Sequence, residues 1–449
     1  MNPKKFDLIL NKKILPFKKT INVDSDKSIS IRSLLISSIS QGSSLIKNTL
    51  ESEDVISAIN CLKKLGVKIS KSKKGEYLVF GKGLGSFQIK KGNKLNFGNS
   101  GTLARLLIGI LSTTPNIKVY LSGDRSLNNR SMKNLIELMS QFGAQFYPKN
   151  KFKFPLRLIS SELPIKINYK AGVSAQLKSA VILAGLNSYG NTIISEIERS
   201  RDHTENMLLD NPRIITIKNE KIKTITICGK RNLKPLKINV PSDPSSAAFF
   251  SALTLLNKNS SIIIKNVCLN PTRTGFYQLL KKQGAKIKFQ NLKTKNNELR
   301  GDVIVKSCNL KPIKASKLFY TTMTDEYPIL FIMASLIKGV SSFKGISDLA
   351  NKESNRIIEM QNILKQINIK STFSNGELKI FGQGMFDASN KTINVPNKGD
   401  HRLCMSSFIL ALLTGAKTTI KNFETVFTSS PSFLKIMKNN LGVAFEIKK

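Results

Sequence analysis

Acidic side chains are scarce in this 449-residue chain. It holds 29 Asp and Glu residues against 71 Lys and Arg, which gives a formal net charge of +42. Such a surplus is compatible with nucleic acid, an anionic membrane or acidic substrates as partners. Lysine accounts for nearly all of the surplus and is spread from end to end beside many Asn and Ile residues. We therefore interpret most of the charge as solvated surface rather than as a binding patch.

Tryptophan and long apolar runs are also missing. Aromatic residues make up 7% of the chain, whereas a dedicated nucleic-acid-binding protein would combine clustered basic tracts with stacking aromatics. The longest nearly apolar run, from Tyr327 to Ile337, is far shorter than the ~20 residues of a membrane helix. The first residues do not contain the apolar stretch of a secretory signal. We expect a cytoplasmic protein with no membrane partner and no specific nucleic-acid partner.

Cysteine and histidine are too few, and too badly spaced, for a metal or disulfide framework. The five cysteines are odd in number and never form C-x-x-C, so we expect reduced thiols. The two histidines, His203 and His401, cannot supply a metal cage. The sequence predicts no metal site.

What the chain does contain is one pattern repeated six times. INVDSDKSISIRSLL from Ile21 and INVPSDPSSAAFFSALTLL from Ile238 align without a gap over their first ten residues. A third clear copy, INVPNKGDHRLCMSSFILALL, begins at Ile393, and looser copies begin at Lys94, Lys166 and Lys317. Equivalent positions are 74, 72, 71, 80 and 75 residues apart: Asn22, Asn96, Asn168, Asn239, Phe319 and Asn394.

Each copy predicts a short strand, a polar turn and a helix, and most copies continue with a second amphipathic helix that runs into Gly-Ala or Gly-Val and further strands. The unit is therefore β-α-β-α-β-β, which belongs to the α/β class. Three units per domain give two similar domains, one formed by residues 1–22 plus 240–449 and the other by residues 23–239. A six-unit open solenoid is the alternative, although solenoid units are usually about 20 to 45 residues long.

The polar turn before each first helix is where chemistry is expected, because a helix N-terminus attracts anions. If the units are arranged alike, these turns converge on a cleft that suits a multiply charged anion. Each turn alone is equally compatible with simple helix capping, and Lys352, Glu353 and Arg356 with a charged helix surface. The turns are Asp26-Lys27-Ser28 with Arg32, Asn99-Ser100-Gly101-Thr102 with Arg105, Ser174-Ala175-Gln176 with Lys178, Asp325-Glu326, and Asp400-His401-Arg402.

Ten ordered motifs together resemble the 3-phosphoshikimate 1-carboxyvinyltransferase (EPSP synthase) family. They are DKSISIRSLL, GNSGTLARLL, GDRSLNNRSM, SAQLKSAVILAGL, RDHTENML, VPSDPSSAAFF, NPTRTGFYQLL, TDEYPILF, KESNRI and GDHRLCMS. SAQLKS and RDHTE are similar to the class II branch. The resemblance implies the enolpyruvyl transferase fold with its active site between two domains, and transfer of the enolpyruvyl group of phosphoenolpyruvate to the 5-hydroxyl of shikimate 3-phosphate in aromatic amino-acid biosynthesis. It implies no cofactor.

The resemblance also implies roles for individual residues. Asp325 is similar to the acceptor of the hydroxyl proton, Glu353 to the acid that protonates C3, and Lys27 to a third catalytic group near both substrates. Arg105 and His401 would support the site or its closure, and glyphosate would compete with phosphoenolpyruvate. The residues similar to shikimate 3-phosphate contacts are Lys27, Ser28, Arg32, Ser174, Ala175, Gln176, Arg201, Asp325 and Lys352. Those similar to phosphoenolpyruvate contacts are Lys27, Gly101, Arg130, Gln176, Arg356 and Arg402.

Several positions depart from the family pattern. Ser131, Asn355 and Ser430 stand where Pro, Asp and Phe are usual, and no cationic contact is assigned near Thr428. The nearest alternative is the related enolpyruvyl transferase that acts on UDP-N-acetylglucosamine, but its usual Cys is missing from SGDRSLNNRSM. A basic nucleic-acid-binding repeat protein is the alternative of another class. We expect a monomer.

Overall fold

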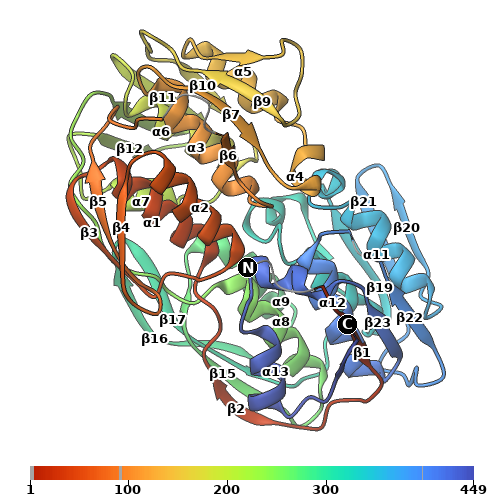
Figure 1. The fold of residues 1–449 in the computed structure, drawn as a ribbon. Coiled ribbons are helices and arrows are strands. Elements are labelled where there is room, and N and C mark those ends of the chain that lie inside the picture. The colour runs from red at the N-terminus through yellow and green to blue at the C-terminus, as the bar shows by residue number, and fades with distance from the viewer. Residues whose placement is uncertain (1–4, 90–93, 397, 449) are drawn as a thin grey trace. The chain divides into compact units, whose positions relative to one another are not determined.

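Six four-stranded sheets of one common design are the framework of the structure, a computed structural model that describes residues 5–89, 94–396 and 398–448. In four of the sheets the strands that flank the first helix of a copy run parallel to each other. In the other two sheets the parallel pair joins a strand of the first copy to a strand of the fourth copy. The remaining two strands extend each sheet beyond one member of the parallel pair. Figure 1 shows the sheets and helices. The predicted β-α-β-α-β-β unit and α/β class are confirmed.

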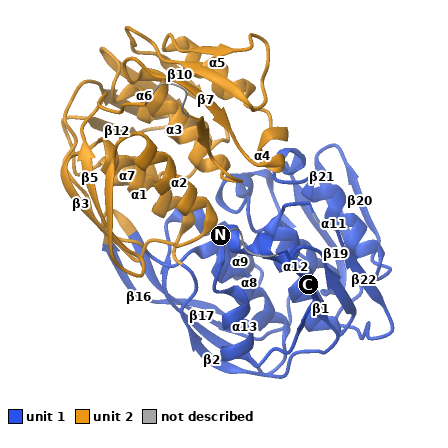
Figure 2. Ribbon diagram, in the orientation of Figure 1, with its two compact units in different colours: residues 1–24, 241–294, 299–449 blue, residues 25–240, 295–298 orange. Residues whose placement is uncertain are grey.

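The chain divides into two compact units, which Figure 2 distinguishes by colour. Unit 1 consists of residues 1–24, 241–294 and 299–449, and unit 2 of residues 25–240 and 295–298. Three of the six sheets fall in each unit, with the hairpin tip at residues 295–298 grouped with unit 2.

Over the residues that the structure describes, unit 2 contains three sheets and seven α-helices. Its sheets, in strand order, are β14 (Lys237–Asn239), β3 (Gln41–Lys47), β5 (Glu76–Lys82) and β4 (Lys68–Lys73); β6 (Lys94–Asn96), β7 (Lys118–Ser122), β9 (Leu156–Ile159) and β8 (Gln145–Tyr147); and β10 (Asn168–Ala171), β11 (Asn191–Glu196), β13 (Lys223–Cys228) and β12 (Ile215–Asn219). Its helices, counted over the described residues, are α1 (Lys27–Ile39), α2 (Glu53–Lys64), α3 (Gly101–Thr113), α4 (Arg125–Asn129), α5 (Lys133–Gln141), α6 (Ala175–Gly185) and α7 (His203–Leu208).

Unit 1 contains the other three sheets. They are β16 (Ile287–Lys295), β17 (Glu298–Lys306), β15 (Ser261–Cys268) and β2 (Lys18–Ile21); β18 (Lys314–Ala315), β19 (Gly339–Lys344), β21 (Glu377–Gly382) and β20 (Ser371–Ser374); and β22 (Thr392–Val395), β23 (Lys417–Ile420), β1 (Asp7–Leu10) and β24 (Glu446–Lys448). Its helices are α8 (Pro244–Leu256), α9 (Gly275–Lys282), α10 (Tyr327–Ser335), α11 (Arg356–Lys365), α12 (His401–Thr414) and α13 (Phe433–Leu441), with 3-10 turns η1 (Pro271–Arg273), η2 (Lys317–Thr322), η3 (Ser347–Asn351) and η4 (Phe423–Thr428).

The first and fourth copies exchange strands where the chain passes from one unit to the other. Strand β2 precedes α1 in sequence but pairs with β15, and β14 precedes α8 but pairs with β3. The sheet of the last copy is completed by β1, which lies between β23 and β24. Sheet pairing therefore ties both ends of the chain into unit 1.

The first helices of the copies form the centre of each unit. In unit 1, α8, α10 and α12 pack against one another, and every residue of α8 and α12 is buried. A helix that is buried on all sides carries no polar stripe, which explains runs such as PSSAAFFSALTLL. In unit 2, α3 packs against α6 and α1. The polar N-terminal turns of these helices are thus held by a rigid core.

One glycine recurs where a sheet meets the end of a first helix. A Cβ at Gly81 would overlap the carbonyl oxygen of Ser40, one at Gly229 that of Ser188, and one at Gly382 that of Ile337. Each of these carbonyls lies just beyond, or at the end of, the helix of the same copy. Only glycine allows such an approach. The copies therefore share this close backbone contact as well as their order of strands and helices.

The fifth copy corrects one sequence-based expectation. The KLFY segment from Lys317 was expected to be a strand, but it forms the 3-10 turn η2, and the strand is the two-residue β18 just before it. Leu, Phe, Tyr and Thr favour strands, but here the buried Tyr320 packs beside Tyr327 of α10, with ring centroids 5.9 Å apart. Packing of one aromatic side chain outweighs the local preference.

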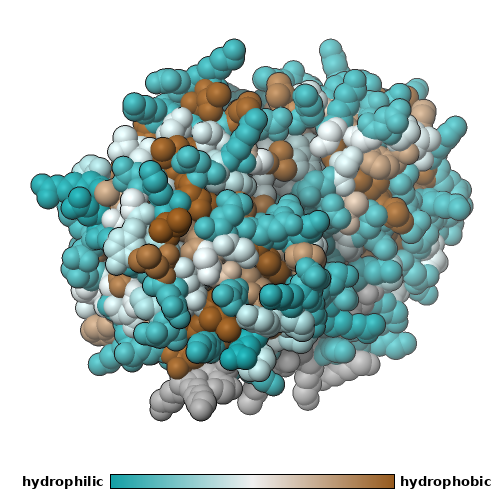
Figure 3. Space-filling model, turned by 90° about the horizontal axis from the view of Figure 1, so that it is seen from above, coloured by the Kyte–Doolittle hydropathy of each residue, from teal (hydrophilic) through white to brown (hydrophobic). Residues whose placement is uncertain are grey.

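No helix in the described ranges is long and apolar enough to cross a membrane. On the face in Figure 3, hydrophilic side chains predominate and hydrophobic ones occur in small groups. The five cysteines are free, and Cys61, Cys268 and Cys404 among them are buried.

Candidate active site

Close packing of two helices brings the first group of predicted site residues together in unit 2. A Cβ at Gly109 of α3 would lie 2.5 Å from the carbonyl oxygen of Ala180 in α6, so glycine permits the approach. The N-terminal residues of the two helices are consequently in contact. Gln176 accepts a hydrogen bond from Arg105 Nη1 at 2.9 Å through Oε1 and donates from Nε2 to Thr102 Oγ1 at 2.9 Å.

Gly101 lies between two guanidinium groups at the start of α3. Arg105 Nη1 donates to the Gly101 carbonyl at 3.1 Å, and Arg130 Nη2 donates to Asn99 Oδ1 at 3.2 Å. A Cβ at position 101 would lie 2.8 Å from Nη1 of each arginine. Ser100 caps the helix by accepting from Leu103 N–H at 3.2 Å. The GNSGT turn is therefore both a helix cap and a cationic surface.

The turn before α1 presents a lysine and a buried arginine. Asp26 caps the helix by accepting from Ile29 N–H at 2.8 Å. Lys27 Nζ lies 2.9 Å from Asp54 Oδ2 of α2, and both side chains are largely buried. Arg32, 2% exposed, donates to Ser28 Oγ at 2.5 Å. The Lys27–Asp54 pair holds the ammonium group in one position.

The other predicted unit 2 residues lie at the starts of α6 and α7. Ser174 caps α6, accepting from Leu177 N–H at 3.4 Å, and Ala175 is the first residue of that helix. Arg201 lies, partly exposed, in the loop that leads into α7.

In unit 1, Arg356 joins three carboxylates. Its Nη2 lies 2.7 Å from Glu353 Oε2, its Nη1 3.5 Å from Asp325 Oδ1, and its Nε 2.9 Å from Asp400 Oδ2. The guanidinium is 1% exposed. Burial alone would lower the pKa of Arg356, but the charges of Asp400, Glu353 and Asp325 outweigh burial and raise it. The structure thus brings both predicted acid–base carboxylates to one buried cation.

A second arginine, Arg402, lies in the first turn of α12, next to the Asp400 of this cluster. Asp400 caps the helix by accepting from Arg402 N–H at 2.9 Å. The Arg402 guanidinium carbon lies 5.8 Å from the centre of the Phe249 ring. Although this side chain is buried, its Nε and Nη1 have no hydrogen-bond partner among the described residues. Unsatisfied buried N–H groups are costly, and an anion would satisfy them.

Lys352 lies in the segment that leads into α11. Its Nζ is 2.5 Å from Asp348 Oδ2 and 5.7 Å from the centre of the Tyr320 ring. Asp348 Oδ2 also accepts from Tyr320 OH at 2.6 Å, and burial together with the Asp348 charge raises the pKa of that phenol. Neither Lys352 nor Glu353 is helical, because α11 begins at Arg356. The charged-helix-surface interpretation of these residues is wrong.

Sequence reasoning missed the partners that hold these groups. Asp54, Asp348 and Asp400 each pair with a predicted site cation, and only Asp400 lay in a turn that had been singled out. Asp54 comes early in a helix predicted only as amphipathic, so no local signal marked it.

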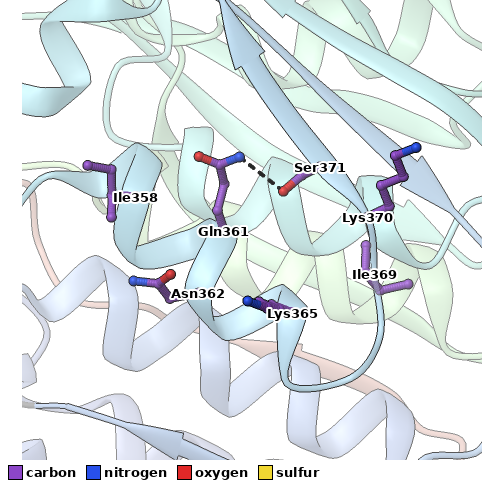
Figure 4. Close-up of a pocket in the computed structure, with 7 residues that line it drawn as sticks. All are labelled: Ile358, Gln361, Asn362, Lys365, Ile369, Lys370 and Ser371. Carbon is purple, nitrogen blue, oxygen red and sulfur yellow. Dashed lines mark hydrogen bonds between the residues drawn. The ribbon is translucent and has the colours of Figure 1, made fainter.

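A shallow hollow in unit 1 contains none of the predicted residues. It has a volume of about 350 Å³ and lies between α11 and the start of β20 (Figure 4). Its floor includes a hydrogen bond from Gln361 Nε2 to Ser371 Oγ at 3.2 Å. The lining residues are Ile358, Gln361, Asn362, Lys365, Ile369, Lys370 and Ser371. Its lining has no carboxylate and no arginine, so it is not the candidate site.

Six mixed sheets of this order form the fold of the enolpyruvyl transferases. An enolpyruvyl transferase of Streptomyces tendae, NikO, has the same fold, with a TM-score of 0.74 at 12% identity, over 99% of each chain. The chain belongs to the EPSP synthase (3-phosphoshikimate 1-carboxyvinyltransferase) family, whose model matches residues 12–437.

Individual relatives agree with this assignment. A 3-phosphoshikimate 1-carboxyvinyltransferase of Zymomonas mobilis is 36% identical over 444 residues, covering 98% of this chain and 97% of the relative. One of Petrotoga mobilis is 39% identical over 421 residues, covering 93% and 96%. The solved structure of EPSP synthase from Acinetobacter baumannii has a TM-score of 0.84 at 32% identity, over 99% of this chain and all of that one. The resemblance found in the sequence is confirmed.

Proposed function

We propose that this chain transfers the enolpyruvyl group of phosphoenolpyruvate to the 5-hydroxyl of shikimate 3-phosphate, releasing phosphate. The family membership supports the reaction. The observation that carries the assignment of roles is the Arg356 cluster, in which two carboxylates lie against one buried guanidinium. A reaction that moves protons in both directions needs such groups beside an anion-binding cation.

The chemistry runs by addition and elimination. In the addition, Asp325 accepts the proton of the 5-hydroxyl as its oxygen bonds to C2 of phosphoenolpyruvate, and Glu353 donates a proton to C3. In the elimination both proton transfers are reversed. Glu353 takes a proton back from C3, Asp325 returns its proton to the departing phosphate, and the double bond is regenerated. Lys27, fixed by Asp54 at 2.9 Å, is placed to assist proton transfer and to attract both substrates. Atoms balance without any redox partner.

The cations divide between the two substrates. We assign the phosphate and ring of shikimate 3-phosphate to Lys27, Ser28, Arg32, Ser174, Ala175, Gln176, Arg201, Asp325 and Lys352. We assign phosphoenolpyruvate to Lys27, Gly101, Arg130, Gln176, Arg356 and Arg402. The buried N–H groups of Arg402 support its role, because a guanidinium binds carboxylate or phosphate through two parallel hydrogen bonds.

We further propose that units 1 and 2 act as the two domains predicted from the sequence, residues 1–22 with 240–449 and residues 23–239. Bringing their charged N-terminal turns together around the substrates would orient the reactants and exclude water. The enzyme would work as a monomer in the cytoplasm. Sedimentation of the purified protein would test its oligomeric state.

The test is phosphate release from phosphoenolpyruvate, with and without shikimate 3-phosphate, for the wild type and for Asp325→Asn. Release that depends on shikimate 3-phosphate and collapses in the variant supports both the reaction and the role of Asp325. Release with UDP-N-acetylglucosamine instead would identify the related transferase. No release with either acceptor would refute the proposal. The +42 charge would then favour a nucleic-acid-binding role, which a gel-shift assay at several salt concentrations would test.

A further inference from the structure

A buried cluster of four charged side chains lies inside unit 2, apart from the residues assigned above. Lys178 Nζ of α6 is 2.8 Å from Glu196 Oε1 and 2.8 Å from Glu205 Oε1. Lys223 Nζ lies 3.6 Å from Glu196 Oε2 and 3.6 Å from Glu205 Oε1. The side chains of Lys178, Glu196 and Glu205 are 0% exposed, and that of Lys223 is 8% exposed. Two positive and two negative charges make the cluster neutral.

The cluster ties together four elements of the unit. Lys178 lies in α6, Glu196 ends β11, Glu205 lies in α7 and Lys223 begins β13. Glu196 and Lys223 are also directly paired across β11 and β13. A buried ion cluster is costly to desolvate, and it often stabilises a fold no more than well-packed apolar side chains would. The presence of the cluster is therefore better explained by a role in specifying geometry than by a gain in stability.

Two neighbours of the cluster hold Arg32. Ser179 follows Lys178 on α6, and Thr204 precedes Glu205 on α7. Arg32 donates from Nε to Thr204 Oγ1 at 2.9 Å and from Nη2 to Ser179 Oγ at 3.1 Å. Thr204 in turn donates to Ser179 at 2.8 Å between the hydroxyl oxygens. Hydroxyl acceptors fix the direction of a guanidinium without cancelling its positive charge.

A third neighbour fixes the chain beside Arg201. Glu196 Oε1 accepts hydrogen bonds from Ser200 N–H at 2.8 Å and from Ser200 Oγ at 2.7 Å. Lys178 Nζ donates to the Ser200 carbonyl at 3.4 Å. All three polar groups of Ser200 are thus engaged by the cluster, and Ser200 directly precedes Arg201.

We propose that the Lys178–Glu196–Glu205–Lys223 cluster, with Ser179 and Thr204, positions Arg32 and Arg201 for the phosphate group of shikimate 3-phosphate. The proposal rests on the function proposed above and adds residues that act through these arginines. Arginines held in their binding geometry lose less conformational entropy when the phosphate binds. Arg32 lies in α1, which packs in unit 2 against α7, one of the four elements that the cluster joins (Figure 2).

The experiment compares Ser179→Ala and Glu205→Gln with the wild type and with Ser188→Ala. Ser188 is a matched control, since it is a buried serine just beyond the other end of α6 whose Oγ donates to the Gly185 carbonyl at 3.0 Å. Steady-state kinetics give separate KM values for both substrates, calorimetry gives the Kd of shikimate 3-phosphate, and a thermal melt reports folding. Because Ser179→Ala removes only a hydroxyl group, it still tests the inference if Glu205→Gln does not fold.

We expect Ser179→Ala and Glu205→Gln to raise both the KM and the Kd of shikimate 3-phosphate by about tenfold, as expected when a buried donor loses its acceptor. The KM of phosphoenolpyruvate should stay within about twofold of wild type, because its contacts are not held by the cluster. Ser188→Ala should leave both KM values unchanged.

Two results would overturn the inference. One is a Ser179→Ala enzyme that binds shikimate 3-phosphate as tightly as the wild type does. The other is an equal rise of both KM values that follows the loss of thermal stability, since that describes a merely structural cluster. A wild type that releases no phosphate in the presence of shikimate 3-phosphate would instead refute the proposed function, and this inference with it.

Discussion

The Asp400 carboxylate accepts a hydrogen bond from Arg356 Nε at 2.9 Å, in a position where both side chains are almost fully buried. The same carboxylate accepts from the backbone N–H of Arg402 at 2.9 Å and from Ser354 Oγ at 3.0 Å. One acidic side chain therefore sets the direction of Arg356 and the start of the helix that carries Arg402. Both arginines are proposed contacts of phosphoenolpyruvate.

The first prediction concerns this carboxylate. In Asp400→Asn one oxygen becomes an NH₂ group, which cannot accept from Arg356 or from Arg402 N–H. We expect the KM of phosphoenolpyruvate to rise about tenfold. The free energy of unfolding should fall by less than the roughly 3–5 kcal/mol of a fully broken buried pair, because Asp325 and Glu353 still face Arg356. Steady-state kinetics and thermal melts would measure the two effects.

Glu137→Gln is the control for this experiment. Glu137 lies 3.9 Å from Lys133 on the exposed face of α5, and exposed pairs of this kind contribute at most about 1 kcal/mol. If Asp400→Asn behaves like Glu137→Gln in both assays, the assigned role of Asp400 is wrong.

Much of the local structure was predictable from the sequence, because the signals are local. Ser100, Ser174 and Asp243 each cap the helix that begins at the next residue, as capping residues before apolar runs predict. The six-fold repeat predicted the succession of strands and helices in each copy, and motif strings marked most of the cationic turns.

The rest depended on contacts between residues far apart in the chain. Asp400 lies 44 positions from Arg356, and Asp54 belongs to a different helix from Lys27. Nothing in a single sequence pairs such residues, since each carboxylate alone fits a solvated surface. The exchange of β2 and β14 between sheets could not be predicted either, because the copies that begin at Ile21 and Ile238 have similar sequences at the point of exchange.

The second prediction tests the recurring glycine. In Gly229→Ala the new methyl group would overlap the Ser188 carbonyl, and backbone must move to relieve it. We expect the free energy of unfolding to fall by about 1–3 kcal/mol or more. Gly172→Ala is the comparison, because a Cβ there meets nothing within 4 Å. Similar denaturation midpoints for the two variants would contradict the packing argument.

The third prediction concerns the pH dependence of stability. Burial raises the pKa of Asp24, and the nearby Asp243 charge adds to this, although Ser432 N–H donates to the carboxylate at 2.9 Å. A folded-state pKa above the unfolded value means that the folded protein binds this proton more tightly. The contribution to stability is therefore fully present below the unfolded pKa and is lost as the pH rises through the folded one.

Asp24→Asn removes this titration. We expect the variant to melt at a higher temperature than the wild type at pH 7, and the difference to shrink as the pH falls toward the ordinary Asp range. Thermal melts in a series of buffers would measure the difference. A difference that does not change with pH would show that Asp24 titrates alike in the folded and unfolded chain.

The last prediction concerns inhibition at Gly101. Glyphosate should compete with phosphoenolpyruvate, as the family resemblance implies, and we expect this competition to depend on the space at Gly101. In Gly101→Ala the methyl group would lie 2.8 Å from Nη1 of both Arg105 and Arg130, so the ends of both side chains must shift. The longer inhibitor should lose more binding than the smaller substrate does.

We expect the inhibition constant to rise about tenfold or more, a usual effect of one added methyl group in a tight pocket, with a smaller rise in the KM of phosphoenolpyruvate. Initial rates over a grid of inhibitor and phosphoenolpyruvate concentrations separate the two constants. An unchanged ratio of the inhibition constant to that KM would show that the methyl group does not discriminate between the two molecules.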